Sequence, residues 1–290
     1  MLQDCFETDL RCAADLLAGA DSVVIAAGAG IGVDSGLPDF RGRDGFWGAY
    51  PALGRARMDF TDIANPAAFQ RSPELAWGFY GHRLDLYRRT VPHAGFAILR
   101  ALAACLPRGG FVFTSNVDGQ FQKAGFAAAR VVEAHGSIHR LQCLTPCSNT
   151  TWSATGFVPE VDVAQCALLN EAPRCPGCNA LARPNILMFG DWHWLSDEAD
   201  RQQTQFDDWW RDVQRPVVLE LGAGTAIPTV RRFSETLGVP LIRINPDAPG
   251  IGGQSGIALA MRARDALERI ADMLSTRLPD FTQQRTSAAH

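Results

Sequence analysis

The chain lacks the features that would place it in a membrane or on a nucleic acid. None of its apolar runs approaches the length that spans a bilayer, and its first residues, MLQDCFETDLRCAADLLAGAD, show neither the basic start nor the unbroken apolar stretch of a secretory signal. We therefore expect a cytoplasmic protein with no membrane partner. The net charge of −4 gives no electrostatic reason to expect nucleic acid as a partner either.

Internal repeats, blocks of like charge and low-complexity linkers are absent as well. The remaining composition is typical of a globular protein, since 47% of the 290 residues are hydrophobic and the length suffices for one large domain and a smaller one. Eight cysteines in a cytosolic chain favour metal binding or buried thiols over disulfides, so their spacing is informative.

A glycine-rich loop follows the first apolar run. Val23 to Ala27 predicts a buried strand, and the segment GAGIGVDSGLPDFRG, which begins with Gly28, Ala29 and Gly30, comes directly after it. Glycine removes the Cβ atom where a backbone approaches a ligand or takes a positive φ, and the N–H groups of such a turn bind phosphate at the start of a helix. A tight turn without a ligand is the alternative, but a bare turn needs no charged and aromatic residues. Three such residues follow the loop: Asp39, Phe40 and Arg41.

This loop differs from the dinucleotide fingerprint of ordinary dehydrogenases. Val33 stands where the third glycine would, and no strand ending in an acidic residue follows about twenty residues later. The run GAGIGVDSGLPDFRG instead resembles the first signature of the sirtuins, the NAD-dependent protein-lysine deacylases. The resemblance implies NAD as the cofactor, bound by the loop and by the cluster after it.

A second apolar strand, Phe111 to Thr114, leads into polar residues. Polar side chains at the carboxyl end of a parallel strand lie where α/β folds bind ligands, although Asn, Asp and Gly also form turns for purely local reasons. The segment TSNVDGQFQKAG resembles the second sirtuin signature, which implies that Asn116 and Asp118 face the nicotinamide ribose. Three residues depart from the usual Gln, Leu and His of that signature: Ser115, Gln120 and Phe121.

A third short strand, Val131 to Glu133, leads to His135. A single histidine is more often structural than catalytic, but one at a strand end beside a glycine, after two other site-forming strands, is a candidate catalyst. The resemblance implies that His135 is the general base. His139 receives no role.

Two cysteine pairs indicate a metal site. Cys143 and Cys147 are followed, after an irregular stretch, by Cys175 and Cys178, a pattern typical of a tetrahedral structural zinc ion that folds a small insert. Cys166 is the one other candidate ligand in this region. Four thiolates leave no open position on the zinc ion, so we expect no catalytic role for it.

Two later segments extend the resemblance. LARPNILMFG, which includes Phe189, resembles the sirtuin stretch beside the substrate peptide, although an ordinary strand of the sheet is the alternative. After the strand Val217 to Leu221, Gly222 and Gly224 stand where the family has Gly-Thr-Ser, so any phosphate contact there would come mainly from backbone N–H groups. Asn245, after the strand Leu241 to Ile244, fits the asparagine on the adenosine side.

Residues 43–90 carry turn signals and short helical segments. Within them Tyr80 and Arg83 stand one helical turn apart, and GFYGHRLDLY resembles the sirtuins that remove malonyl, succinyl or glutaryl groups. The resemblance implies that Tyr80 and Arg83 bind the distal carboxylate of the acyl chain. The alternative is that Tyr80 packs inside this segment, that Arg83 is solvated on its surface, and that the enzyme is a plain deacetylase.

We expect an α/β fold in which a Rossmann-like parallel sheet domain comprises residues 1–42, 91–136 and 189–278. A helical flap at 43–90, a zinc-binding small domain at 137–188 and a mobile tail at 279–290 complete the chain. Helices are expected near 5–18, 92–105, 197–213 and 258–275. The expected function is NAD-dependent deacylation of protein lysine, which yields nicotinamide and O-acyl-ADP-ribose. An ADP-ribosyltransferase, an NAD hydrolase and a non-enzymatic NAD-binding module are the alternatives, and the sequence does not predict the oligomeric state.

Overall fold

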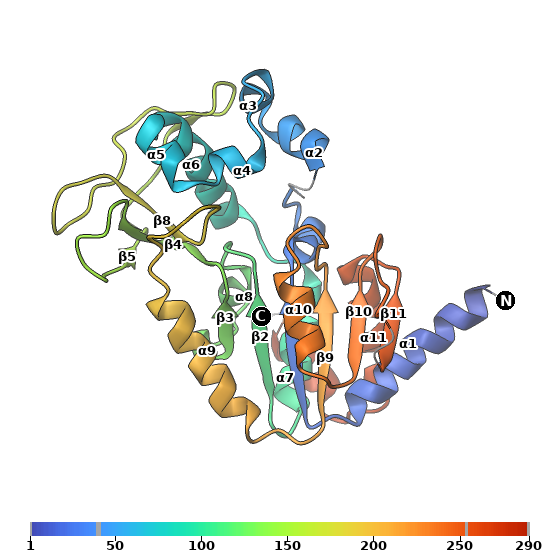
Figure 1. The fold of residues 1–290 in the computed structure, drawn as a ribbon. Helices are drawn as coiled ribbons and strands as arrows, with labels where there is room; N and C mark the ends of the chain where they lie inside the picture. Colours follow the sequence, from blue (N-terminus) through green and yellow to red (C-terminus); the bar gives the residue numbers. More distant parts are fainter. Residues whose placement is uncertain (1, 39–41, 253–254, 289–290) are drawn as a thin grey trace.

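A parallel sheet of six strands forms the centre of the computed structural model, which describes residues 2–38, 42–252 and 255–288 (Figure 1). The strands lie in the order β11-β10-β9-β1-β2-β3, and every neighbouring pair is parallel. Their bounds are β1 (Ser22–Ala27), β2 (Gly110–Thr114), β3 (Val131–Glu133), β9 (Pro216–Leu221), β10 (Leu241–Ile244) and β11 (Gly256–Leu259). The expected α/β fold with a parallel sheet is confirmed.

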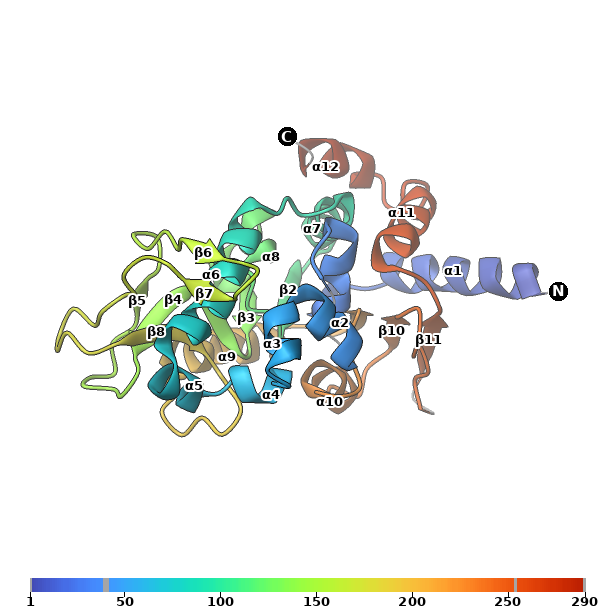
Figure 2. The same ribbon diagram turned by 90° about the horizontal axis from the view of Figure 1, so that it is seen from above.

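Helices cover both faces of this sheet. Alternate residues of β1 point to opposite faces, so Val23 and Ile25 pack into one core while Val24 and Ala26 pack into another. The first core contains residues of α1 (Leu2–Ala18), α7 (Ala94–Cys105) and α11 (Ala263–Leu274), and the second contains residues of α9 (Asp197–Trp210) and α10 (Thr229–Thr236). Figure 2 shows α7 and α11 on one side of the sheet and α9 and α10 on the other.

A third core joins the helices expected between residues 43 and 90 to a small sheet and a hairpin. The helices are α2 (Gly42–Ala49), α3 (Pro51–Arg55), α4 (Phe60–Ile63), α5 (Pro66–Arg71) and α6 (Pro73–Arg89). The β elements are a small sheet with the order β5-β4-β8, in which β4 is Gly136–Cys143, β5 is Trp152–Ser153 and β8 is Ala182–Ile186, and a hairpin of β6 (Val161–Asp162) and β7 (Ala167–Leu168). The side chain of Asn65 caps the start of α5, and α5 and α6 each begin with a proline, whose fixed φ suits the first position of a helix.

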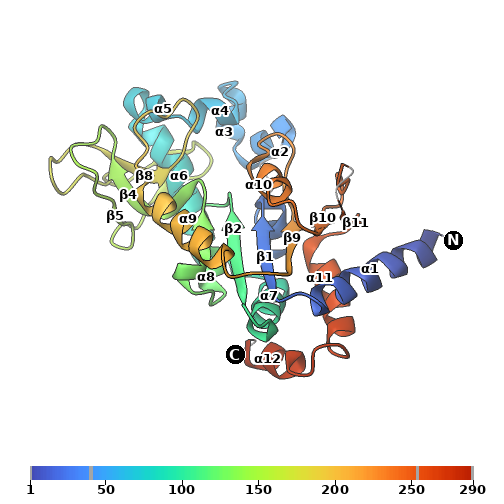
Figure 3. The ribbon, with the colours of Figure 1, turned by 60° about the horizontal axis from the view of Figure 1, so that its bottom comes forward.

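The carboxyl ends of the six parallel strands face this third core (Figures 1 and 3). Ligands of open α/β sheets bind at that edge, where loops replace the strands. In the described part of the chain no helix is both long and apolar enough to cross a bilayer.

The end of the chain departs from expectation in two ways. The helix expected at 258–275 begins only at Ala263, and Gly256–Leu259 instead forms β11, which pairs with β10. A four-residue apolar run carries too little periodicity to separate a strand from a helix. The tail expected to be mobile from residue 279 contains α12 (Phe281–Ala288), and the side chain of Phe281 is fully buried in the first core.

Candidate functional site

Two glycine turns touch each other at the carboxyl edge of the sheet. The N–H of Gly30 donates to the carbonyl of Gly222 at 3.0 Å, and a Cβ atom on either Gly28 or Gly30 would lie 2.7 Å from the backbone of Gly222. Gly222 itself has a φ of 59°. The first loop therefore needs glycine because a second turn packs against it, whereas the sequence suggested a ligand contact or a positive φ at these positions.

The loop continues into a short 3₁₀ helix, η1 (Ala29–Ser35), which begins with Ala29 and is followed by Gly36 with a φ of 83°. The expected NAD contacts Asp39, Phe40 and Arg41 lie outside the described residues.

Asn116 links the second signature to this loop. Its Nδ2 atom donates to the carbonyl of Gly28 at 3.1 Å, and its backbone N–H donates to the hydroxyl of Thr114 at 3.0 Å. The first contact crosses from the end of β2 to the end of β1, its neighbouring strand, and the second is local to the end of β2. Asn116 thus has a fixed position at the edge where ligands of this fold class bind.

Asp118 is buried, and its carboxylate accepts a hydrogen bond from the N–H of Gln120 at 3.0 Å. Burial raises the pKa of Asp118 to about 6, although the N–H of Gln120 acts in the opposite direction. His139, which lies in β4, contacts the carbonyl of Asp118 at 2.9 Å. Gly119, the residue between Asp118 and Gln120, has a φ of 69°. The local turn considered as an alternative is therefore present, and it holds Asp118 at the strand end.

His135 follows β3, with its Nε2 atom 3.1 Å from the hydroxyl of Thr229. Its carbonyl accepts a hydrogen bond from the N–H of Leu187 at 3.0 Å. Burial lowers the pKa of His135, which favours the unprotonated imidazole. The sequence analysis missed Thr229, and nothing in the local pattern marks it, because its position depends on how α10 packs.

A cavity of about 260 Å³ opens between the glycine turns and the end of β10. Gly30, Gly222 and Asn245 line it, together with residues that the sequence analysis did not select: Val33, Asp34 and Arg262. Gly224 is not among the lining residues. The buried Nδ2 of Asn245 donates to the carbonyl of Ala223 at 2.9 Å, so this side chain shapes the cavity wall.

Tyr80 and Arg83 are both buried on α6, and the guanidinium carbon of Arg83 lies 6.0 Å from the centre of the Tyr80 ring. The Arg83 side chain also lies over Phe79, at 5.2 Å. Tyr80 packs inside this segment as the alternative proposed, stacked on Phe69 at 5.5 Å. The other half of that alternative, a solvated Arg83, is wrong.

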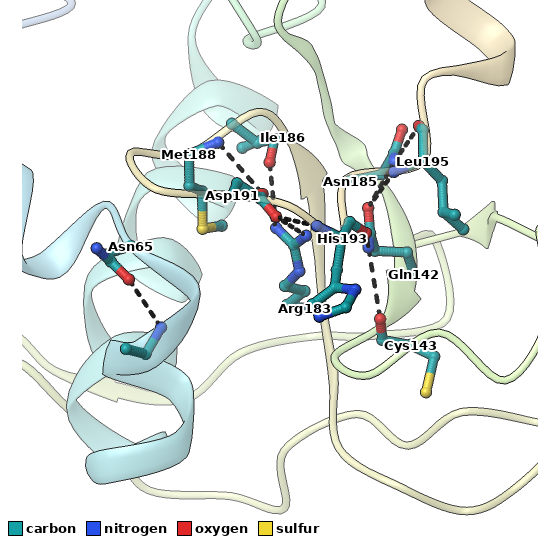
Figure 4. Close-up of polar contacts among 11 residues, drawn as sticks. Asn65, Gln142, Cys143, Arg183, Asn185, Ile186, Met188, Asp191, His193 and Leu195 are labelled. Carbon is teal, nitrogen blue, oxygen red and sulfur yellow. Dashed lines mark hydrogen bonds and ion pairs between the residues drawn. The ribbon is translucent and has the colours of Figure 1, made fainter.

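Phe189 follows β8 and is 36% exposed, with its N–H bonded to the carbonyl of Ala64 at 2.9 Å. The strand expected over 181–190 ends at Ile186, at the edge of the small sheet. A buried ion pair holds the loop that carries Phe189: the guanidinium of Arg183 donates to both carboxylate oxygens of Asp191 at 2.7 and 2.8 Å (Figure 4).

The four expected metal ligands come together. The Sγ atoms of Cys143, Cys147, Cys175 and Cys178 all lie within 4.8 Å of one another, which suits a tetrahedral thiolate site for zinc. Cys166, the substitute considered in the sequence, is not part of this group. The side-chain amide of Gln142, next to Cys143, joins this site to the following loop: its Nε2 atom donates to the carbonyl of His193 at 2.8 Å, and its Oε1 atom accepts from the N–H of Leu195 at 3.2 Å (Figure 4).

Comparisons with known proteins agree with this geometry. The model of the Sir2 family matches residues 28–208. An NAD-dependent protein deacylase of Aeropyrum pernix is 31% identical over 266 residues, which cover 89% of this chain and 94% of that protein. An NAD-dependent protein deacylase 2 of Pyrobaculum aerophilum is 32% identical over 269 residues, covering 91% and 96% of the two chains.

Solved structures support the same fold. A crystal structure of a Sir2 homolog–NAD complex has a TM-score of 0.68 to this chain at 23% identity, and covers 92% of this chain and 94% of its own. A Sir2 homologue in complex with ADP-ribose has a TM-score of 0.69, also at 23% identity, with coverages of 92% and 97%. Because the family model spans more than half of the sequence and several relatives exceed 30% identity over nearly their whole length, this chain belongs to the Sir2 family.

Proposed function

We propose that this protein is an NAD-dependent protein-lysine deacylase that releases nicotinamide and forms O-acyl-ADP-ribose. The observation that carries the proposal is the position of His135 at the end of β3, on the same edge of the sheet as Asn116 and the paired glycine turns. Relatives named NAD-dependent protein deacylase support it. The partners would be proteins or peptides that carry acyl-lysine.

The described residues fit NAD. The cavity lined by Gly30, Gly222 and Asn245 would hold the adenosine side, and backbone N–H groups near the paired turns would face the phosphates. Asn116 and Asp118 would face the nicotinamide ribose. NAD, when bound, supplies the ribose that receives the acyl group.

His135 would act as the base by accepting a proton at Nε2. Burial lowers its pKa, which favours the unprotonated imidazole, the form that a base requires. The hydroxyl of Thr229 lies 3.1 Å from that atom and would hold the ring in position until a substrate hydroxyl replaces it there.

The cysteine cluster would hold one structural zinc ion. Four thiols within 4.8 Å form a closed donor set, so the metal would stabilise the fold of residues 137–188 and would not contact substrate. We also propose the division of the chain into a sheet domain, a helical flap and a zinc-binding small domain.

Succinyl or malonyl groups are the acyl groups that this site suits best. A charged acyl end can enter an apolar pocket only where a partner awaits it, and the buried Arg83 beside Tyr80 supplies a guanidinium fork and a phenol. Plain deacetylation is the second candidate, because it would need no charge at this position.

Mass spectrometry of the products tests the proposed activity. NAD and an acyl-lysine peptide should yield nicotinamide, O-acyl-ADP-ribose and free lysine in equal amounts. ADP-ribosylated protein would indicate a transferase, free ADP-ribose without loss of the acyl group would indicate a hydrolase, and binding without turnover would indicate a non-enzymatic module. His135→Ala is the control that separates enzyme turnover from contamination.

A further inference from the structure

A second tyrosine on α6, Tyr87, holds the guanidinium group of Arg83. The phenolic oxygen of Tyr87 accepts hydrogen bonds from Nε of Arg83 at 2.9 Å and from Nη2 at 2.6 Å. Tyr80, Arg83 and Tyr87 stand at positions i, i+3 and i+7 of the helix, which places them on one face. All three side chains are buried.

The surroundings make this contact significant for the orientation of Arg83. Aromatic rings flank the guanidinium carbon, with ring centres at 5.2 Å for Phe79, 5.4 Å for Tyr87, and 6.0 Å for both Phe60 and Tyr80. Rings attract a cation from their faces but offer it no directional acceptor. The phenolic oxygen of Tyr87 is a directional acceptor, and it therefore fixes the orientation of the guanidinium group.

A residue of the second signature, Gln120, holds Tyr87 in place. The carbonyl of Tyr87 accepts a hydrogen bond from the buried Nε2 of Gln120 at 3.2 Å, and the N–H of Gln120 is bonded to the carboxylate of Asp118. Gln120 is one of the three residues that differ from the usual second signature. A leucine at this position could not donate this hydrogen bond, so the departure from the family pattern serves to tie α6 to the loop after β2.

We propose that Tyr87 is a positioning residue that orients Arg83 and thereby sets the preference for acyl groups that end in a carboxylate. This inference rests on the proposed function. Because the phenolic oxygen of Tyr87 accepts from both Nε and Nη2, it sets the plane in which the guanidinium group would meet an acyl carboxylate. Tyr87 acts through Arg83 and does not touch the substrate.

The test compares two substitutions that each delete one buried phenolic hydroxyl from the same aromatic cluster. Tyr87→Phe removes the acceptor of Arg83, whereas Tyr50→Phe is the matched control, because the Tyr50 ring lies 4.9 Å from Phe79 while its hydroxyl contacts His82 at 2.9 Å. For each variant, kcat and KM are measured with succinyl-lysine and acetyl-lysine forms of one peptide, and the melting temperature is recorded.

We expect Tyr87→Phe to lower kcat/KM for the succinyl peptide about tenfold, mainly by raising KM, since a hydrogen bond to a charged group is lost. The acetyl peptide should change less than about twofold, and Tyr50→Phe should leave the ratio of the two substrates unchanged. A double-mutant cycle adds a second criterion: in an Arg83→Met background, Tyr87→Phe should have no further effect on the succinyl peptide.

Other outcomes overturn the inference in ways that can be told apart. In one outcome the wild type prefers the succinyl peptide, and this preference is lost in Arg83→Met but kept in Tyr87→Phe. The proposed role of Tyr87 would then be wrong, while the proposed acyl specificity would stand. An equal loss with both peptides, or additive effects in the double mutant, means that Tyr87 only supports the fold. A wild type that deacylates without preferring the succinyl peptide removes the proposed acyl specificity and this inference but leaves the deacylase function, whereas no deacylation of either peptide removes the proposed function as well.

Discussion

The imidazole of His135 and the hydroxyl of Thr229 meet at 3.1 Å although they stand 94 positions apart in the chain. His135 follows β3 at the edge of the central sheet, and Thr229 opens α10 after β9, which is separated from β3 by two strands. The contact therefore bridges the carboxyl ends of β1 and β2, the two strands that lie between β9 and β3. A base held in this way keeps a defined ring orientation.

Replacing Thr229 with valine removes this hydroxyl with little change of volume. We expect kcat/KM to fall about fivefold, as for the loss of one hydrogen bond, and the acid limb of the pH–rate profile to move, since the contact involves the titrating ring. Thr229→Ser should restore both. An unchanged pH profile in the valine variant would show that Thr229 does not position the base.

Substituting His135 by alanine should abolish deacylation without unfolding the protein, because the side chain belongs to the carboxyl edge and not to any of the three cores. Loss of a general base lowers the rate by about 10² to 10⁴. Steady-state kinetics with circular dichroism as the folding control tests this. A well-folded variant with near-native turnover would show that another group is the base.

Glu133, two residues before the proposed base, makes the stability of the protein depend on pH. Burial raises the pKa of Glu133 to about 7, the side chain of Ser137 lowers it, Asp118 raises it by repulsion, and Gln122 and Gln202 lower it. A raised pKa means that the protonated form stabilises the fold: this contribution is complete below about pH 4.5 and is lost as the pH rises through 7. The loss is on the order of 3 kcal/mol.

Glu133→Gln mimics the protonated form, so it should flatten the dependence of the free energy of unfolding on pH between about 4.5 and 8 and should stabilise the protein at pH 8. Denaturant titrations at several pH values measure this. If wild type and variant show parallel pH curves, the carboxyl group of Glu133 titrates at its ordinary pKa and the argument from burial is wrong.

Zinc content provides a test that does not depend on activity. Metal analysis of the purified protein should find one zinc ion per chain, and Cys175→Ser should lower both the zinc content and the melting temperature, since metal-binding energy is folding energy in such inserts. Cys12→Ser is the control, because Cys12 lies exposed on α1 and outside the cluster. Full zinc content in a stable Cys175→Ser variant would contradict the assignment of the ligands.

The central strands could be predicted from sequence because a buried parallel strand is a short continuous apolar run that ends in polar residues. Ser22–Ala27 and Gly110–Thr114 follow this rule, whereas Gly256–Leu259 is too short and too exposed to be distinguished from the helix after it. The cysteine cluster was also predictable, because the spacing of its ligands is local within each pair.

Contacts between distant segments could not be predicted in this way. The reason for glycine at position 28 is the backbone of Gly222, and the partner of His135 is Thr229; both depend on the order of strands in the sheet, which local patterns do not encode. The burial of Arg83 likewise depends on aromatic residues from two helices, Phe60 on α4 and Phe79 on α6.

Arg83→Met tests the acyl specificity directly. Methionine keeps most of the length and the apolar character of the side chain in its aromatic surroundings but removes the charge that would receive a carboxylate. Loss of a partner for a buried charge costs about 2–5 kcal/mol, so desuccinylation should fall at least about thirtyfold while deacetylation is kept or improved. Arg89→Met is the control on the same helix, because Arg89 is exposed and paired with Asp85 at the surface. If wild type removes acetyl as readily as succinyl groups, or if Arg83→Met slows both equally, Arg83 does not bind the acyl carboxylate.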